Sequence, residues 1–356
     1  MNLIREKLFT PATLGPMHLD NRIVMAPMTR SRAGADDVPT AHAIEYYRQR
    51  ASAGLIISEG SQISPQAKGY PRTPSIYSSE QIQAWKAVTA AVHARGGRIY
   101  LQLWHVGRVS HPFVQPHGEL PVGPSAIKVD GELFTSEGMK AFETPRVLDI
   151  AEIPDVVNQF RQGAENAMLA GFDGVEIHGA NGYLIDQFLR DGANQRTDAY
   201  GGPVENRIRF LREVVEAVIP VFGASRTGIR LSPVFDLNST RDSAPATTFG
   251  AAVDMLSEYG LAYLHVVELG DPSFDFQDLR RRFKGTYIAN GAYTRERAID
   301  AVETGMADFV SFGTPFIANP DLPERLAIGA PLNTPDPTKF YQREDDGYTD
   351  YPTLAA

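Results

Sequence analysis

Short apolar runs alternate with amphipathic stretches along most of the chain. Eight of these runs have the hydrophobicity expected of buried strands, at 22–27, 55–60, 98–104, 174–178, 227–233, 261–267, 286–291 and 308–313. Helices with one apolar face are expected between them, at 42–53, 79–95, 154–170, 204–219, 247–259, 274–283 and 294–304. Strictly alternating elements indicate a parallel sheet covered by helices. Eight such units in 356 residues favour an α/β fold of the closed (β/α)8 TIM-barrel type.

Three segments fall outside this repeat. Residues 14–21 predict a small N-terminal hairpin, and the tail 331–356 carries tyrosines that can fold back over a barrel mouth. The stretch 105–150, rich in Pro and Gly, reads as a lid-like insertion after the third strand. Within it, 127–129 is expected to turn at Asp130-Gly131 into 132–134 as a hairpin. We interpret residues 1–356 as a single domain.

Composition narrows the classes of function. Lys and Arg number 34 against 43 Asp and Glu, which gives a net charge of −9, and no long basic run is present. Nucleic acids and anionic membranes are therefore unexpected partners. The absence of cysteine excludes disulfides, thiolate-bound zinc and iron–sulfur clusters, and we expect no metal. No signal peptide or membrane span is evident, so a cytoplasmic enzyme, as a monomer or weak homodimer, is expected.

Polar residues collect where the predicted strands end, which is the face on which barrel enzymes build their sites. The fourth strand ends in His178-x-x-Asn181-x-Tyr183. Two neutral donors beside a weak acid suit the binding of an oxygen atom while a proton is delivered nearby, although an ordinary turn would use the same residues. Arg230 points inward on the fifth strand and needs an anionic partner, either Glu176 or the electron-rich edge of a cofactor.

Glycine-containing loops follow the last two strands, with the sequences Asn290-Gly291-Ala292 and Phe312-Gly313-Thr314. Backbone N–H groups in such loops, helped by a short helix, bind phosphate in many barrels. Simple tight turns are the alternative interpretation.

Seven segments form a joint pattern that runs from about residue 8 to the end of the chain: 21–30 (NRIVMAPMTR), 102–108 (QLWHVGR), 178–183 (HGANGY), 188–192 (FLRDG), 196–202 (RTDAYGG), 317–322 (IANPDL) and 347–352 (GYTDYP). Together they resemble the old yellow enzyme family of FMN-dependent ene-reductases, which includes N-ethylmaleimide and nitrate-ester reductases.

The resemblance implies how FMN would be held. Ala26, Pro27, Met28 and Thr29 would line the flavin ring, with the Thr29 hydroxyl donating to flavin O4. Gly60 would allow close approach of the ring, and Gln102 would bond its pyrimidine side. Arg230 would lie near N1 and O2. The phosphate would be bound by the loops containing Asn290, Gly291, Gly313 and Thr314.

The resemblance also implies a reaction. NADPH or NADH would reduce the flavin, and an activated alkene would then take the same place and receive hydride from flavin N5. The expected substrates are α,β-unsaturated carbonyl compounds and nitroalkenes, with nitrate esters as a further class. His178 and Asn181 would hold the substrate oxygen and Tyr183 would protonate the α-carbon, while Tyr70, Trp104, Phe235 and Tyr341 are expected as pocket walls.

One departure from the family concerns the phosphate. Relatives commonly carry a basic residue after the glycine of the eighth strand, where this chain has Thr314. The phosphate would then lose a charge-assisted bond and rely on backbone donors. The tail also reads Phe340-Tyr341-Gln342-Arg343 where a glycine pair is usual, and Arg343 or another arginine is a candidate for the missing charge.

Two other functions compete with this interpretation. Glu59, Glu176 and Glu268 lie near the ends of strands two, four and six, and paired carboxylates on a barrel are typical of glycoside hydrolases. A flavin-binding scaffold without turnover is the second alternative; it would be yellow, yet NAD(P)H would not bleach it.

Overall fold

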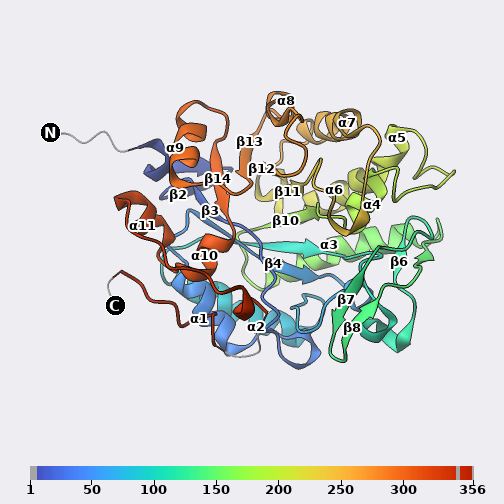
Figure 1. Cartoon of the computed structure of the whole chain (residues 1–356), viewed down its shortest axis with the longest axis horizontal. Helices are drawn as coiled ribbons and strands as arrows, with labels where there is room; N and C mark the ends of the chain where they lie inside the picture. Colours follow the sequence, from blue (N-terminus) through green and yellow to red (C-terminus); the bar gives the residue numbers. More distant parts are fainter. Residues whose placement is uncertain (1–5, 342–344, 355–356) are drawn as a thin grey trace.

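The computed structural model describes residues 6–341 and 345–354, and at its centre eight parallel strands close into a barrel (Figure 1). In order around the barrel they are β3 (Ile23–Met25), β4 (Leu55–Gln62), β5 (Ile99–Trp104), β10 (Gly174–Gly179), β11 (Thr227–Leu231), β12 (Tyr263–Val267), β13 (Thr286–Asn290) and β14 (Phe309–Phe312). The barrel closes because β14 pairs in parallel with β3. The predicted TIM-barrel fold is confirmed.

Helices follow the strands, as the periodicity predicts. They are α1 (Ala41–Gln49), α2 (Ser79–His93), α3 (Ile153–Leu169), α6 (Arg209–Phe222), α7 (Pro245–Ser257), α8 (Phe276–Arg282) and α9 (Arg295–Glu303). The start of α2 shows how local sequence sets a boundary, because the Ser78 hydroxyl accepts a hydrogen bond from the Gln81 N–H in a capping box. The expected helix 204–219 is divided at Ile208 into α5 (Val204–Arg207) and α6.

Three short helices were not predicted: α4 (Leu184–Leu189), α10 (Thr314–Ala318) and α11 (Leu322–Ile328). Each comes soon after a strand end, where α4 follows β10 and the other two follow β14. They therefore lie next to the loops in which the candidate chemistry was predicted.

The end of the barrel at which the strands begin is apolar. Inward side chains of the strands form one cluster there with the N-terminal hairpin, and its members are Leu14, Met17, Leu19, Val24, Leu55, Ile57, Tyr100, Ala262, Tyr263, Ile288 and Phe309. The hairpin itself pairs β1 (Ala12–Leu14) with β2 (Met17–Leu19), as predicted. Burial of these groups closes one end of the barrel and leaves the carboxyl ends of the strands as the place for a site.

The insertion holds two small sheets. One pairs β6 (Val122–Gly123) with β9 (Arg146–Val147), and the other is a hairpin of β7 (Glu132–Thr135) with β8 (Gly138–Ala141), seen at the lower right of Figure 1. The predicted hairpin is wrong in register, because its turn lies at Ser136-Glu137 and not at Asp130-Gly131. Gly131 lies instead at the open base, where its carbonyl accepts a hydrogen bond from the Phe142 N–H.

The tail folds back across the barrel mouth and is tied down by two arginines. Arg30 and Arg32, just after β3, both donate to the Phe340 carbonyl, and Arg30 also donates to the Gly347 carbonyl at 2.8 Å. The Tyr348 ring stacks on Tyr46 with 4.1 Å between centroids. Arg343, the candidate counter-charge for a phosphate, lies outside the described residues. Within the described part of the chain, none of the helices has both the length and the apolar character that a membrane crossing requires.

Candidate active site

A chain of buried hydrogen bonds crosses the barrel just below its mouth. Glu176 on β10 accepts from Gln102 Nε2 at 2.8 Å and is hydrogen-bonded to His265 Nδ1 at 2.8 Å, and His265 Nε2 lies 2.7 Å from Ser311 Oγ. All four side chains are buried. Because an unpaired buried carboxylate would be costly, this network both satisfies Glu176 and orients the Gln102 amide.

Arg230 lies above this network with unused donors. Its Nη2 donates to Asn290 Oδ1 at 3.0 Å, whereas Nε and Nη1 are buried and have no hydrogen-bond partner among the described residues. No ion pair with Glu176 is found in that part of the chain, so of the two predicted partners the carboxylate is not the one used. A buried guanidinium with two free donors points to an anionic or electron-rich ligand.

His178, Asn181 and Tyr183 are brought together at the end of β10. The Tyr183 ring lies 5.1 Å from the His178 ring and 5.1 Å from the Trp104 ring, edge to face in both cases. His178 Nδ1 and Asn181 Oδ1 are buried without a partner among the described residues. Unsatisfied polar atoms in a buried place require a ligand or water. His178 Nδ1 can donate to a ligand oxygen, whereas Asn181 Oδ1 can only accept, so the predicted donor to a substrate oxygen on this side chain is Nδ2.

The electrostatics of this group keep its members uncharged. Burial, and then the positive charge of Arg230, lowers the pKa of His178 well below its ordinary value, so that the imidazole stays neutral. Burial raises the pKa of Tyr183 well above its ordinary value, so that the phenol keeps its proton. The site therefore offers neutral donors and a protonated weak acid at neutral pH.

The expected walls are partly in place. The Tyr70 ring stacks on Trp104 with 5.9 Å between centroids, and its hydroxyl is 3.3 Å from that of Tyr183. Tyr341, from the tail, is 58% exposed and lines a cavity beside Thr29. Phe235 is half-buried in the loop after β11, and its part in the site stays a prediction.

Gly60 lies against the indole of Trp104. A Cβ atom at this position would lie 2.7 Å from Trp104 Cε3, so the glycine allows close approach of this wall. The expected approach of a flavin ring to Gly60 stays a prediction.

Two neighbouring cavities complete the site. The first, of about 250 Å³, is lined by Ala26, Pro27, Met28, Thr29, Arg230, Asn290, Gly313, Thr314, Ile317, Phe340 and Tyr341. The second, of about 690 Å³, is lined by Leu269, Asn290, Gly291, Ala292, Tyr293, Ser311, Phe312, Gly313, Thr314, Pro315, Asn319, Leu332, Asn333, Thr334 and Pro335. Asn290, Gly313 and Thr314 belong to both, so the cavities adjoin.

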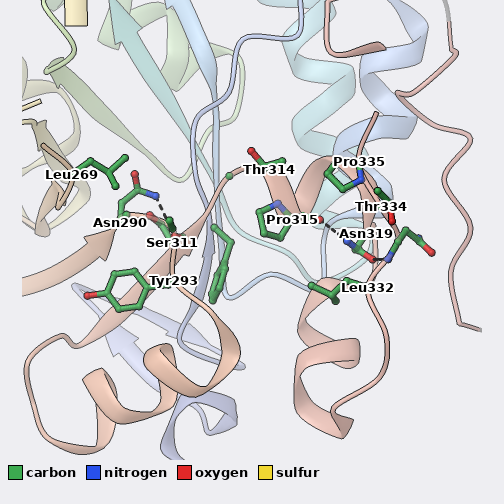
Figure 2. Close-up of a pocket in the computed structure, with 15 residues that line it drawn as sticks. Leu269, Asn290, Tyr293, Ser311, Thr314, Pro315, Asn319, Leu332, Thr334 and Pro335 are labelled. Carbon is green, nitrogen blue, oxygen red and sulfur yellow. Dashed lines mark hydrogen bonds between the residues drawn. The ribbon is translucent and has the colours of Figure 1, made fainter. Parts of the chain in front are cut away.

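The cavities and the unpaired donors fit FMN. The smaller cavity contains the free guanidinium beside Pro27, Met28 and Thr29, which matches the edge of a flat polar ring. The larger one lies between the ends of β13 and β14 on one side and the segment 332–335 on the other (Figure 2), where amide and hydroxyl groups predominate among its polar lining groups. Gly291, with φ of +152°, has no room for a Cβ atom, which would lie 2.8 Å from the Glu268 carbonyl oxygen.

The larger cavity leads to a first prediction. Thr314 is exposed and lines both cavities, so a longer side chain has room there. Because a charge-assisted bond contributes about 1.5–3 kcal/mol, Thr314→Arg should tighten FMN binding by roughly tenfold or more. Fluorescence titration of the flavin-free protein measures this. Riboflavin, which lacks the phosphate, serves as the control and should bind both proteins alike; equal tightening of both ligands would contradict a phosphate at this position.

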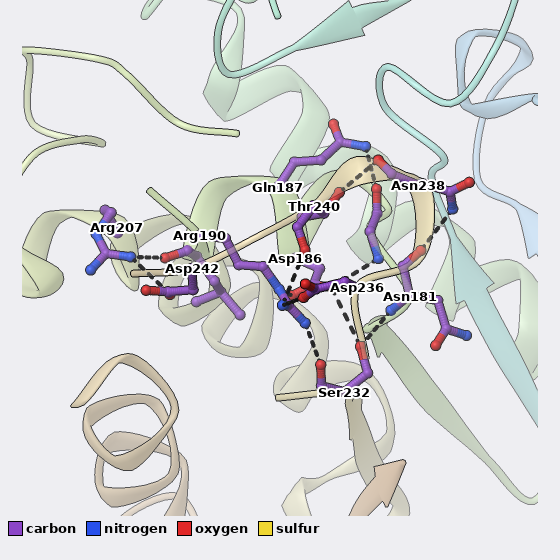
Figure 3. Close-up of polar contacts among 12 residues, drawn as sticks. Asn181, Asp186, Gln187, Arg190, Arg207, Ser232, Asp236, Asn238, Thr240 and Asp242 are labelled. Atoms are coloured by element: carbon purple, nitrogen blue, oxygen red, sulfur yellow. Dashed lines mark hydrogen bonds and ion pairs between the residues drawn. The ribbon is translucent and has the colours of Figure 1, made fainter. Parts of the chain in front are cut away.

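The turn that carries Asn181 is held by residues that the sequence did not reveal (Figure 3). Asn181 has a left-handed backbone, with φ of +61°. Its N–H donates to Ser232 Oγ at 2.7 Å and its carbonyl accepts from Asn238 Nδ2 at 2.8 Å. The next N–H, of Gly182, donates to Asp186 Oδ2 at 2.8 Å. These bonds hold a backbone conformation that an asparagine adopts less readily than a glycine.

Behind that turn lies a buried ion pair. Asp186 lies on α4 and Arg190 follows its last residue, one helical turn later. The distance between Asp186 Oδ1 and Arg190 Nε is 2.7 Å, and the side chains are 0% and 1% exposed. Arg190 also donates to the carbonyls of Ser232 and Thr240, which belong to the loop after β11. The pair thus joins the Asn181 turn to that loop.

The three carboxylates of the hydrolase interpretation are all hydrogen-bonded to other groups of the protein. Glu59 accepts from the Arg30 N–H at 3.0 Å, and burial raises its pKa to about 7. Glu268 accepts from the Tyr287 and Tyr293 hydroxyls at 2.8 and 2.6 Å. Glu176 is held by Gln102 and His265 as described above. A hydrolase needs carboxylates that face its substrate.

Comparison with known proteins agrees with this geometry. The sequence model of the NADH:flavin oxidoreductase / NADH oxidase family matches residues 7–333. The chain is 45% identical to 12-oxophytodienoate reductase 1 of Oryza sativa subsp. japonica, over 98% of this chain and 93% of that protein. It is also 45% identical to 12-oxophytodienoate reductase 2 of Arabidopsis thaliana, over 98% and 96%.

Solved structures give the same result. Morphinone reductase in complex with tetrahydroNAD superposes with a TM-score of 0.94 at 51% identity, over 98% of this chain and 97% of that one. The old yellow enzyme homologue from Zymomonas mobilis gives a TM-score of 0.95 at 46% identity, over 98% and 100%. These likenesses overturn the hydrolase interpretation and bear out both FMN and a nicotinamide coenzyme as cofactors. The chain belongs to the NADH:flavin oxidoreductase / NADH oxidase family and is a flavin-dependent oxidoreductase of the old yellow enzyme type.

Proposed function

We propose that this protein reduces activated C=C bonds of α,β-unsaturated carbonyl compounds and nitroalkenes at the expense of NADPH or NADH, with nitrate esters as a further substrate class. The observation that carries the proposal is the grouping at the end of β10 of His178, whose buried Nδ1 has no partner among the described residues, with Asn181 and the Tyr183 phenol. The names of the similar reductases, for an oxophytodienoate and for morphinone, are those of ketones, which supports a carbonyl group as the activating function.

Each residue has a definite role in the proposed reaction. Bound FMN supplies the hydride that it has taken from the nicotinamide. His178 and Asn181 donate hydrogen bonds to the carbonyl or nitro oxygen, which polarises the alkene and stabilises the negative charge that develops on that oxygen. Tyr183, kept protonated by burial, gives its proton to the α-carbon.

The same proposal assigns the cofactor contacts. Ala26, Pro27, Met28 and Thr29 would line the ring, Gln102 would contact its pyrimidine side, and Arg230 would use its free donors on the N1 and O2 edge, where negative charge develops on reduction. The loops of Asn290, Gly291, Gly313 and Thr314 would bind the phosphate.

We also propose that residues 1–356 act as a single FMN-binding domain with the insertion as part of the substrate pocket. Val129, Leu133 and Phe142 of the insertion pack in one cluster with Trp104, and Tyr70 and Tyr183 pack against that cluster. A small alkene therefore meets the insertion on one side of the pocket. A monomer or weak homodimer is the proposed oligomeric state.

An anaerobic absorbance titration tests the function. NADPH or NADH should bleach the visible flavin band, and 2-cyclohexenone should restore it. Because general acid catalysis contributes about 10²–10⁴-fold, Tyr183→Phe should slow the recovery at least about tenfold more than the bleaching. Equal slowing of both steps would count against Tyr183 as the proton donor, and a band that neither coenzyme bleaches would make the protein an inert flavin carrier.

A further inference from the structure

The proposed proton donor has to be recharged in every catalytic cycle. Tyr183 is half-buried and packs against Trp104 and the insertion cluster, so a substrate bound over these rings would cover its hydroxyl. Among the described residues, the Tyr70 hydroxyl lies 3.3 Å from its hydroxyl, and the Asn238 amide, which donates to the Asn181 carbonyl, also influences the pKa of Tyr183. A carboxamide does not release a proton under ordinary conditions, whereas a phenol both gives and accepts one.

Tyr70 lies next to the Tyr183 phenol, on a loop that is bonded to the tail. It lies on the loop that joins β4 to α2, is half-buried, and stacks on Trp104. The exposed Tyr341 of the tail lies beside it, since Arg72 from the same loop donates to the Tyr341 carbonyl at 2.8 Å and the charge of a Tyr341 phenolate would act on Tyr70. The Tyr70 hydroxyl is therefore close to that of the donor, and the loop that carries Tyr70 is bonded to the solvent-facing tail.

Contacts of the backbone hold the loop that carries the Tyr70 ring. The backbone carbonyl of Tyr70 accepts a hydrogen bond from the Thr73 hydroxyl at 2.9 Å. Gly69, next to it, packs so closely on the insertion that a Cβ atom would lie 2.6 Å from the Val109 carbonyl oxygen. The loop is thus held against the insertion, and the distance between the two phenols does not depend on a free surface segment.

We propose that Tyr70 is the relay through which Tyr183 regains its proton from solvent. The inference rests on the proposed function, and the relay is a proton transfer in which nothing is oxidised or reduced. When Tyr183 has given its proton to the α-carbon, the O–H bond of Tyr70 breaks and a new O–H bond forms on the Tyr183 phenolate. Tyr70 then takes a proton from solvent, so each cycle draws one proton from bulk water through Tyr70. This is a role beyond that of a pocket wall, because it uses the hydroxyl and not the ring.

Tyr70→Phe tests the relay by removing the hydroxyl alone. The enzyme is reduced anaerobically and mixed in a stopped-flow instrument with 2-cyclohexenone, in weakly buffered solution with a pH indicator. In the wild type, proton uptake should keep pace with the recovery of the flavin band. In Tyr70→Phe, a slow uptake phase of about one proton per site should trail the flavin signal, by about tenfold or more, because relay by a positioned group is worth at least that factor. Uptake that keeps pace in this variant would overturn the relay.

Two further variants separate this inference from other causes. Tyr77→Phe removes a phenol from the same loop, half-buried but bonded to Gln81 and outside the site, and should show no slow phase. A slow phase there would mean that the loop and not the Tyr70 hydroxyl is responsible. Tyr183→Phe tests the proposed function itself: if its flavin signal recovers at the wild-type rate, Tyr183 is not the donor, whereas slow recovery there together with prompt uptake in Tyr70→Phe would remove only the relay.

Discussion

His178→Ala and Asn181→Ala should each lower kcat/KM for 2-cyclohexenone by about 10²–10³-fold, the usual effect of losing one donor to a developing oxyanion. Flavin reduction by NADPH should fall much less, because in that step the nicotinamide becomes positive and no negative charge develops on an oxygen bound to these residues. Separate stopped-flow measurements of the two half-reactions give both numbers.

The substitution Asn181→Asp sharpens this test, because it keeps the size of the side chain and replaces the amide donor by a carboxylate. Placed against an oxygen that gains negative charge, it should be at least as damaging as alanine. Asn158→Ala, on the exposed face of α3, is the matched control and should leave both half-reactions unchanged. If the alanine variants lose both half-reactions equally, the two residues position bound molecules in general and do not act on the oxyanion.

The barrel could be predicted from the sequence because its strands are buried on both faces and its helices on one. Strands such as Leu55–Gln62 and Gly174–Gly179 are buried at every position, and their apolar residues, Leu55 to Ile57 in the first and Val175 with Ile177 in the second, mark them in the sequence although polar residues follow or alternate with them. The break at Ile208 could not be predicted, since Arg207 ends α5 through contacts with Gly202 and Leu189 that only the folded chain provides.

The insertion hairpin shows how a strong local signal can mislead. Asp-Gly is a favoured turn pair, and Gly131 does have a positive φ, of +97°. However, the segment before it has a different partner: Val129 is buried in the cluster around Trp104, and the Asp130 N–H donates to Ser239 Oγ at 3.0 Å. Tertiary contacts therefore place the glycine at the base of the hairpin, and the next glycine with positive φ, Gly138, follows the true turn.

The reactive residues were visible in the sequence, but their supports were not. His178, Asn181 and Tyr183 lie within six positions and have the chemistry of their role. Ser232 and Asn238 come from about fifty residues further along, and nothing local connects them with Asn181. One signal was available, because Asp186 and Arg190 have the i, i+4 spacing of a helical ion pair, although spacing does not show that the pair is buried.

Arg190→Met should lower the free energy of unfolding at pH 7 by about 3–5 kcal/mol, because it leaves Asp186 buried and without its counter-charge. Arg281→Met is the matched control: its ion pair with Asp275 has the same length, 2.7 Å, but the side chains are 61% and 60% exposed, and the loss should stay below about 1 kcal/mol. Urea unfolding followed by circular dichroism measures both. Equal losses in the two variants would contradict a structural role for the buried pair.

The pH dependence of that loss identifies its cause. Burial already raises the pKa of Asp186, and loss of Arg190 should raise it further. A carboxyl group whose pKa is raised in the folded state stabilises the protein below its unfolded pKa, near about 4, and this contribution is lost as the pH rises through the folded value. The deficit of Arg190→Met relative to the wild type should therefore shrink as the pH is lowered from 7 toward 5.

Adding Asp186→Asn to Arg190→Met should recover part of the lost stability at pH 7, since the uncompensated charge is then gone. A deficit that is constant with pH and unrelieved by Asp186→Asn would point instead to the lost bonds to Ser232 and Thr240, and hence to displacement of the loop that holds Asn181.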